Sequence, residues 1–412
     1  MNPKRINIRQ KMANLVPQRW YATHHFDRYP AKMIPQLARF AIELCTKKGD
    51  SILDPFCGCG TVLVESRIAG RKATGIEINP YAVVLARAKS YLYQESILKE
   101  IIDRVILNAR RISRRVKIRD SWLDYWFADS TLQQLLALRR TIDRNQRDIK
   151  PSYVYALRAV LAVTVRLACK ADPRSPKPFI SKRARRERCR KTFNAFEIFS
   201  NEGYKFIKAT NELRNLVLDG RASRIRVIRA DSRELEKNNR LGLFDAIISS
   251  PPYLTAQDYY RSSKLEISVL GLMSESELRG LGSVIIGSGR GQATTDAPEK
   301  GNFCPRELKA LAKVNERAAK IGVSFIADMH KVIKGCYERL KKGGRCCFII
   351  GDSSIHDIQL EVHKWVTEVA IREKLNLEKH FIDVIRSRRV PPQRQGHSSV
   401  IRQEHILIFS KP

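Results

Sequence analysis

The sequence contains no long apolar run and few cysteines, and each absence argues against a class of protein. No stretch approaches the ~18 consecutive apolar residues that a transmembrane helix needs, so an integral membrane protein is excluded. The first 20 residues are basic and lack the apolar core of a secretory signal. The nine cysteines include no CxxC pair, which argues against a disulfide scaffold and a structural zinc site. We therefore expect reduced thiols, no metal centre and a cytoplasmic location.

Acidic residues are scarce relative to basic ones. In 412 residues, 42 Asp and Glu stand against 76 Lys and Arg, a net charge of +34. With 43% apolar residues, the chain can still bury the core of one large domain or two ordinary ones. Because neutralising phosphates releases condensed counterions, this charge favours a nucleic acid as the partner. A membrane surface is disfavoured, since no strongly amphipathic terminal helix accompanies the charge. Solvated helix faces in a generally basic proteome are the alternative explanation.

The basic residues concentrate between residues 101 and 200, which contain 24 Lys and Arg but 9 Asp and Glu. The densest runs are Arg110–Lys117 and Lys182–Arg190. The predicted nucleic-acid contacts lie in the second run: Lys182, Arg183, Arg185, Arg186, Arg188 and Arg190. Helical periodicity predicts helices over 97–115, 131–145, 152–170 and 193–217. We interpret 95–220 as a basic helical insertion and candidate target-recognition region.

A glycine-containing turn between two predicted strands is the first chemical motif. An apolar strand at 51–54 leads into the turn 55–61, a helix over 62–69 and a second strand at 73–77. This βαβ order predicts a parallel sheet and a nucleotide-like cofactor at the turn. The third glycine of the dinucleotide motif is missing, and Asp54 would repel a pyrophosphate but accept hydrogen bonds from an ammonium group. Glu77, at the end of the second strand, can bind two ribose hydroxyls.

The second motif, Ser250-Pro251-Pro252-Tyr253, follows the predicted strand 244–249. Consecutive prolines fix the backbone and leave carbonyl oxygens that can accept from a bound amino group. Ser250 offers another acceptor, and Tyr253 a flat face for stacking a base. Acceptors fixed on both N–H groups of an exocyclic amino group favour a pyramidal nitrogen, whose lone pair can attack a methyl group. A Pro-Pro turn that only closes a strand is the structural alternative.

The rest of the chain resumes an α/β pattern. Strands are expected at 225–231, 345–350, 380–386 and 404–410, and a helix over 319–341. The polar stretch 275–318 is expected to be a mobile loop. The interpretation is two halves of one catalytic domain, 1–94 for the cofactor and 221–412 for catalysis, separated by the insertion. His397 and His405 show no catalytic pattern, and we expect them to be satisfied or exposed side chains.

Together, Asp-Pro-Phe-x-Gly-x-Gly-Thr at 54–61 and Ser-Pro-Pro-Tyr at 250–253 resemble the S-adenosylmethionine-dependent amino-methyltransferases of DNA, the N4-cytosine and N6-adenine type. The resemblance covers most of the chain outside 95–220. It implies an α/β, Rossmann-like class I methyltransferase fold with a seven-stranded, mostly parallel sheet that ends in an antiparallel hairpin. The helical insertion matches no known target-recognition element.

The resemblance also implies a set of site residues. Asp54 would lie near the methionine ammonium of S-adenosylmethionine, Glu77 at its ribose and Asp231 at its adenine. Ser250, Pro251, Pro252 and Tyr253 would form the target-base pocket. The full set of implied cofactor contacts is Ala31, Lys32, Asp54, Phe56, Gly58, Gly60, Thr61, Glu77, Ile78, Asp231 and Ser232.

The expected substrate is DNA, with the target base flipped out of the duplex into the pocket. In the family, serine at the first position of the tetrapeptide is associated with cytosine N4, and Asp or Asn with adenine. We therefore predict a site-specific DNA methyltransferase acting on cytosine N4. The alternatives are adenine N6 in DNA, a base amino group in RNA, a protein substrate, and a catalytically silent nucleic-acid-binding scaffold. The resemblance also suggests a partner in a restriction system.

Overall fold

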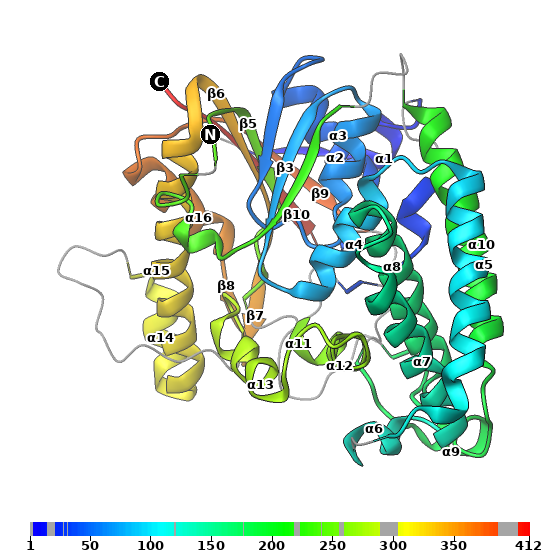
Figure 1. Cartoon of the computed structure of the whole chain (residues 1–412). Coiled ribbons are helices and arrows are strands. Elements are labelled where there is room, and N and C mark those ends of the chain that lie inside the picture. The colour runs from blue at the N-terminus through cyan, green and yellow to red at the C-terminus, as the bar shows by residue number, and fades with distance from the viewer. Residues whose placement is uncertain are drawn as a thin grey trace.

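The computed structural model describes the 412-residue chain with the exception of residues 1–2, 15–20, 28, 31, 119–120, 176, 218–222, 240, 255–258, 289–303 and 386–402. It describes the backbone alone at residues 9, 121, 259 and 260. A twisted sheet and a group of long helices lie side by side (Figure 1). Within the part of the chain that is described, no helix has the length and apolar character to cross a membrane.

Among the described residues, the central sheet has eight strands in the order β1-β9-β10-β6-β5-β2-β3-β4. Their bounds are β1 (Lys4–Ile6), β2 (Ser51–Asp54), β3 (Lys72–Glu77), β4 (Ile225–Arg229), β5 (Phe244–Ser249), β6 (Leu340–Gly351), β9 (Asn376–Val384) and β10 (Gln403–Ser410). Strand β10 is antiparallel to β6 and β9, and the other neighbouring pairs are parallel. A separate ribbon pairs β7 (Ser353–Ile355) with β8 (Ile358–Leu360).

Consecutive residues of the central strands enter opposite cores, because side chains alternate along a strand. Ile52 packs in a cluster with α2 (Pro35–Cys45), α3 (Thr61–Ile68) and α4 (Pro80–Ser90). Leu53 packs in a second cluster with α15 (Glu316–Arg339) and α16 (Val362–Arg372). Strands that are covered on both faces need continuous apolar runs, which explains the sequences of β2, β5 and β6.

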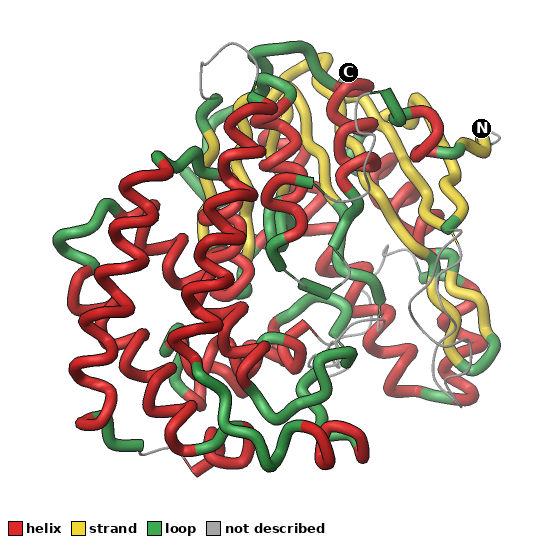
Figure 2. Tube along the Cα trace, turned by 90° about the vertical axis from the view of Figure 1, so that its right-hand side faces the viewer, coloured by secondary structure: helices red, strands yellow, loops and turns green. Residues whose placement is uncertain are grey.

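The insertion folds into helices that lie against one side of this sheet domain (Figure 2). It contains α5 (Glu95–Ile112), α6 (Ser121–Trp126), α7 (Asp129–Asn145), α8 (Pro151–Ala168), α9 (Lys182–Glu187), α10 (Ala195–Leu216) and the 3₁₀ turn η2 (Ser113–Arg115). Helix α8 contacts α4, and α10 contacts the 3₁₀ turn η1 (Ala22–His25). The rings of Phe26 and Phe206 lie 4.5 Å apart between their centroids and join the two parts.

The segment 275–318, which we expect to be a mobile loop, contains the helices α13 (Glu275–Val284) and α14 (Arg306–Val314) near its two ends. The remaining short elements lie elsewhere: α1 (Ile8–Lys11), η3 (Ser232–Glu234), α11 (Tyr259–Ser262) and α12 (Lys264–Leu270). Helix α13 begins with a capping box, in which Ser274 and Glu277 each accept from the other's backbone N–H. Residues 289–303 lie outside the described residues, and the mobility of this segment stays a prediction.

The predicted fold class is confirmed, with two corrections to its strands. Within the described ranges the sheet has eight strands rather than seven, because β1 pairs in parallel with β9 at the edge. Strand β1 has only three residues, two of them basic, and is too short to show a period of two in the sequence. Strand β6 begins at Leu340 rather than at residue 345, so it includes the glycines at 343 and 344. Helices α4 and α16 were not predicted, whereas the four long insertion helices are confirmed.

Candidate active site

A pocket lies at the carboxyl ends of β2, β3, β4 and β5, where a parallel α/β sheet normally binds its ligand. It holds about 910 Å³ of empty space, part of it open to solvent. Of the residues predicted from the sequence, it brings together Lys32, Asp54, Phe56, Gly58, Thr61, Glu77, Ile78, Asp231, Ser232, Ser250 and Pro252. The pocket lining does not include Gly60, Pro251 or Tyr253, and Ala31 lies outside the described residues.

The side chain of Asp54 links the carboxyl end of β2 to that of its neighbour β5. The hydroxyl of Ser249, at the end of β5, donates a 2.6 Å hydrogen bond to Asp54 Oδ1. The backbone N–H of Phe56 donates to the same carboxylate oxygen at 3.1 Å and lies 3.2 Å from the Ser249 hydroxyl. Burial raises the pKa of Asp54 to about 7, despite these hydrogen bonds. The structure thus gives this carboxyl a titration near neutral pH.

Glu77 holds the glycine turn in place. Its Oε2 accepts from the backbone N–H of Gly58 at 2.9 Å, and its Oε1 accepts from that of Asn79 at 2.8 Å. Burial raises the pKa of Glu77 to about 7 as well. Gly60 has φ +89°, and a Cβ there would lie 3.0 Å from the backbone of Ala86. Gly60 is therefore required by the close approach of α4, rather than by a place in the pocket lining.

Asp231 lines the pocket while it is already paired. Arg233 donates to Asp231 Oδ2 at 2.6 Å and also bonds Asp328, at 3.2 Å. The neighbouring Ser232 hydroxyl donates to the backbone carbonyl of Pro55. An adenine amino group at Asp231 would therefore share the carboxylate with a guanidinium. Sequence reasoning did not predict Arg233.

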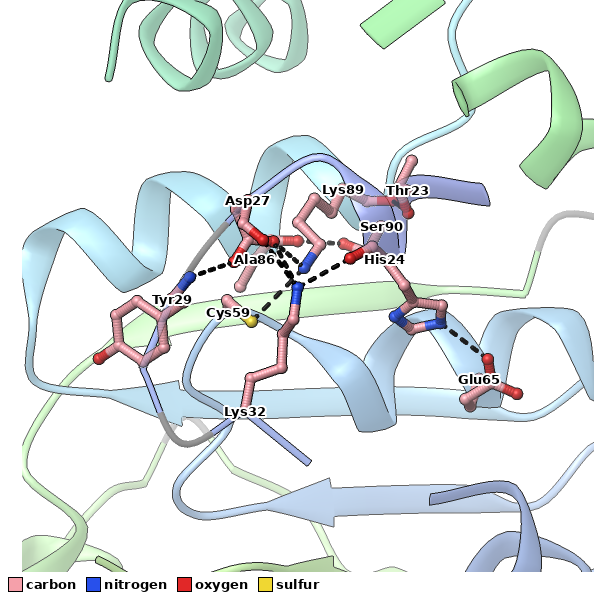
Figure 3. A network of polar contacts seen from close by, with 10 residues as sticks. All are labelled: Thr23, His24, Asp27, Tyr29, Lys32, Cys59, Glu65, Ala86, Lys89 and Ser90. Atoms are coloured by element: carbon pink, nitrogen blue, oxygen red, sulfur yellow. Dashed lines mark hydrogen bonds and ion pairs between the residues drawn. The ribbon is translucent and has the colours of Figure 1, made fainter. Parts of the chain in front are cut away.

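The segment before α2 is tied over the pocket by a buried ion network (Figure 3). The Lys32 ammonium donates to the carbonyl oxygens of His24 and Asp27, at 2.7 and 2.9 Å. Asp27 in turn pairs with Lys89 of α4 at 2.5 Å, with both side chains fully buried. Burial alone would raise the pKa of Asp27, but the charges of Lys89 and Lys32 outweigh it and hold this pKa well below its usual range. The ammonium of Lys32 is thus bound by backbone carbonyl oxygens of the protein itself, although Lys32 lines the pocket.

Glu65 anchors the same segment from α3. Its carboxylate accepts from His24 Nε2 at 2.8 Å, from Arg39 Nε at 2.9 Å and from the Tyr21 hydroxyl. These partners lie on η1, on α2 and just before η1. Sequence reasoning missed this network. Its one visible signal is an acidic residue that directly follows three apolar ones in the helix after the glycine turn.

The Ser-Pro-Pro-Tyr turn and the residue after it are held by contacts with β10 and with the β7–β8 ribbon. The Tyr253 hydroxyl donates to Glu404 Oε1 of β10 at 2.7 Å. The Ser353 hydroxyl of β7 donates to the carbonyl of Leu254 at 3.1 Å. Burial raises the pKa of Glu404 above its usual value. The second contact holds the backbone after β5, and the first makes the orientation of the Tyr253 ring depend on β10, 151 residues further along the chain.

The predicted basic contacts divide into two groups. Lys182, Arg185, Arg186 and Arg190 are exposed. Arg183 is also exposed but pairs with Glu187 at 2.7 Å. Arg188 donates to the carbonyls of Leu167 and Cys169 and lies 4.5 Å from the Phe193 ring centroid, so it satisfies the carboxyl end of α8. Helix α9 lies at the lower end of the insertion, beyond the carboxyl ends of the strands (Figure 1).

The chemistry of the pocket fits S-adenosylmethionine. Asp54 offers an acceptor for an ammonium group, and Glu77 offers one for hydroxyls. Phe56, Ile78 and Ile286 line it with apolar surface suited to a purine. No pyrophosphate would be tolerated beside two buried carboxyls. The carboxyls, the apolar lining and the turn thus match a cationic nucleoside better than a dinucleotide.

Comparisons with known proteins agree with this chemistry. A family described as DNA methylase matches residues 4–88. The Type II methyltransferase M.MvaI of Kocuria varians is 24% identical, over 94% of this chain and 91% of its own. The Type II methyltransferase M.BsoBI of Geobacillus stearothermophilus is 24% identical, over 66% of this chain and 57% of its own. The tRNA (guanine(10)-N2)-dimethyltransferase of Methanothermobacter thermautotrophicus is 46% identical over 52 residues, which are 12% of this chain and 16% of its own.

Similarity to solved structures is low in overall superposition. The crystal structure of TrmN from Thermus thermophilus has a TM-score of 0.33 and 11% identity, and covers 92% of this chain and 49% of that one. Among the described strands, the sheet order with β10 antiparallel to its neighbours, together with the pocket at the strand ends, gives the Rossmann-like fold of S-adenosylmethionine-dependent methyltransferases. Within that class, the chain is similar to the family described as DNA methylase and to the Type II methyltransferases.

We expect the affinity for S-adenosylmethionine to rise between about pH 5.5 and about pH 7.5. Because burial raises the pKa of Asp54 and of Glu77 to about 7, both carboxyls are mainly protonated at the lower pH. Each must lose its proton to attract a cation or to accept from hydroxyls, which contributes up to about tenfold per pH unit for each proton. Calorimetric titration at several pH values measures this.

Asp54→Asn is the control for this pH dependence. It should weaken binding and flatten the profile by one proton, while Glu77 still titrates. An affinity that is constant over this range in the unaltered protein would contradict the assignment of these carboxyls to the cofactor.

Proposed function

We propose that this protein transfers a methyl group from S-adenosylmethionine to the exocyclic amino group of a DNA base, with cytosine N4 as the target. The observation that carries the proposal is the joint position of two motifs. Ser250 and Pro252 line the same pocket as Asp54 and Glu77, and the Ser249–Asp54 hydrogen bond joins the two turns. A methyl donor and an amino acceptor would therefore meet in one cavity.

The protein's own residues would bind the cofactor, orient the target base and polarise its amino group. When bound, S-adenosylmethionine supplies an electrophilic methyl group. The Ser250 hydroxyl and the proline carbonyls would accept from the amino N–H groups of the target base. Those hydrogen bonds localise the nitrogen lone pair, which is otherwise delocalised into the ring. The chemistry needs no covalent intermediate, and the buried thiols of Cys57 and Cys59 have pKa values raised by burial, so they are poor nucleophiles.

Tyr253 would supply the stacking surface for the base. Its hydroxyl is held by Glu404, which fixes the ring without using its face. A base inside a duplex is inaccessible to such a pocket, so the target nucleotide would be flipped. The energy of unstacking would be offset in part by stacking on this ring.

DNA is the preferred substrate because the matching family is described as DNA methylase. Cytosine N4 is preferred because the tetrapeptide begins with serine, the residue that the family associates with cytosine. RNA is the second candidate, supported by the short but 46% identical match to the tRNA dimethyltransferase. Both candidates use the same amino-group chemistry and differ in what the basic surface would bind.

The exposed basic residues of α9 and the turn after it would contact phosphates. Helix α9, which contains Lys182, Arg185 and Arg186, lies at the end of the insertion beyond the carboxyl ends of the strands (Figure 1), and Arg190 follows it in the sequence. Arginine contacts to phosphates position a nucleic acid without reading its sequence. Arg183 is held by Glu187 and Arg188 by backbone carbonyls, so we assign the binding to the other four.

Tyr253→Ala should lower kcat/KM for methyl transfer to DNA by about 5- to 150-fold, the equivalent of about 1–3 kcal/mol of base stacking. Affinity for S-adenosylmethionine should stay nearly unchanged, because Tyr253 does not line the cofactor pocket. Tyr253→Phe is the matched control: it keeps the ring but loses the bond to Glu404, and we expect a smaller loss. An equal loss of cofactor affinity and of transfer in Tyr253→Ala would contradict the assignment to the base pocket.

The double variant Arg185→Gln/Arg186→Gln should flatten the salt dependence of DNA binding. Each phosphate contact contributes about 0.9 to the slope of log K against log salt, so the slope should fall by about 2. Lys47→Gln/Lys72→Gln is the charge-matched control, since these exposed lysines lie at the amino ends of β2 and β3, away from the pocket. Equal slopes for the two double variants, in a filter-binding titration, would show that α9 is not the contact surface.

A further inference from the structure

Three histidines from different elements meet on one face of the sheet. They are His363 of α16, His380 of β9 and His405 of β10, and one ring nitrogen of each lies within 4.8 Å of the others. In the β9–β10 ladder, His405 pairs with Ile382 and Leu407 pairs with His380. Because side chains two residues apart share a face, both imidazoles point to the same side, towards α16. The cluster therefore depends on tertiary structure, not on a sequence motif.

A carboxylate orients this cluster. Asp352, just after β6, accepts from His363 Nδ1 at 2.8 Å and lies 3.4 Å from His405 Nε2. His380 Nε2 lies 2.9 Å from His405 Nδ1. A histidine that donates one ring N–H to a carboxylate keeps its other nitrogen as a lone-pair donor. Metal-binding histidines in proteins characteristically make this second contact.

The three histidines lie at the end of an otherwise apolar interface between α16 and the sheet. On the same face, β10 continues with Leu407 and Phe409, which pack in an apolar cluster with Trp365 of α16. His363 and His405 are buried at the end of this apolar interface, whereas His380 is half-buried. Buried imidazoles at such a position must be satisfied by partners, and the half-buried ring leaves a path from solvent.

We propose that His363, His380 and His405 bind a divalent late transition-metal ion, Zn²⁺ being the best fit, with Asp352 orienting His363. Imidazole nitrogen suits Zn²⁺, Co²⁺ and Ni²⁺ rather than Mg²⁺ or Ca²⁺. Tetrahedral ligands at about 2.0–2.1 Å from zinc lie about 3.3 Å apart, so the ring nitrogens, which lie within 4.8 Å of one another, must approach by up to about 1.5 Å. The His363 and His405 rings are stacked with centroids 3.7 Å apart, and one of them must turn about its Cβ–Cγ bond for both to face one ion.

The ion would be structural. It would join α16, β9 and β10 at the end of the sheet, next to Glu404, the residue that holds Tyr253. It takes no part in methyl transfer, so this inference is independent of the proposed function. It also differs from the expectation of no metal centre, which rested on the absence of a local motif.

The test is titration of the untagged, full-length, chelator-treated protein with Co²⁺ and then Zn²⁺. We expect one equivalent of Co²⁺ per chain, with the visible absorption of a tetrahedral site and without a thiolate-to-cobalt band, followed by displacement by Zn²⁺. His380→Asn, at the half-buried position, should abolish this absorption. Asp352→Asn should weaken binding by about 10- to 100-fold. His25→Asn, an exposed histidine outside the cluster, should leave the spectrum unchanged.

Two results would overturn the proposal. One is the absence of saturable Co²⁺ binding to the unaltered protein, which needs no variant to fold. The other is binding that His380→Asn leaves intact, or that shows a thiolate band and disappears in Cys189→Ser/Cys304→Ser, the cysteines that are not buried. Near-ultraviolet circular dichroism of each variant separates loss of ligands from loss of fold.

Discussion

The hydrogen bond from Ser249 to Asp54 is the contact on which the rest of the site depends. It closes the carboxyl ends of β5 and β2, neighbours in the sheet, at 2.6 Å and with both side chains buried. The glycine turn directly follows Asp54 in the sequence, and the Ser-Pro-Pro-Tyr turn directly follows Ser249. Because the carboxyl ends of parallel strands lie at the same edge of a sheet, the two turns can share one pocket although some 190 residues separate them.

The acidic lining of the pocket contrasts with the basic charge of the whole chain. A chain with a net charge of +34 lines its pocket with Asp54, Glu77 and Asp231, while residues 101–200 contain 24 Lys and Arg but 9 Asp and Glu. The carboxyls suit a cationic donor, and the arginines suit a polyanion. Within the core, Asp27 and Lys89 compensate each other, which allows the segment over the pocket to be charged and buried at once. Removing one partner of such a pair leaves an unpaired buried charge, which typically costs about 3–5 kcal/mol.

Local patterns predicted much of this structure. Apolar runs ending in glycine or proline identified β2, β3 and β5, and helical periodicity identified α5, α7, α8 and α10. Side-chain partners far apart in the chain left no such trace: Asp27 with Lys89, Tyr253 with Glu404, and the three histidines meet only once the strands are aligned. Arg185 and Arg188 look alike in a basic run, yet one is exposed and the other caps α8. Periodicity reports which face is buried, and it carries no information on which element covers that face.

The most direct test of the account is transfer of labelled methyl from S-adenosylmethionine to unmethylated DNA of mixed sequence and to RNA in parallel, with digestion to nucleosides and identification by mass. The account predicts N4-methylcytosine in the DNA. N6-methyladenine in the DNA would preserve the amino-group chemistry and overturn the assignment to cytosine. Label in RNA or protein alone, with none in DNA, would contradict the central claim.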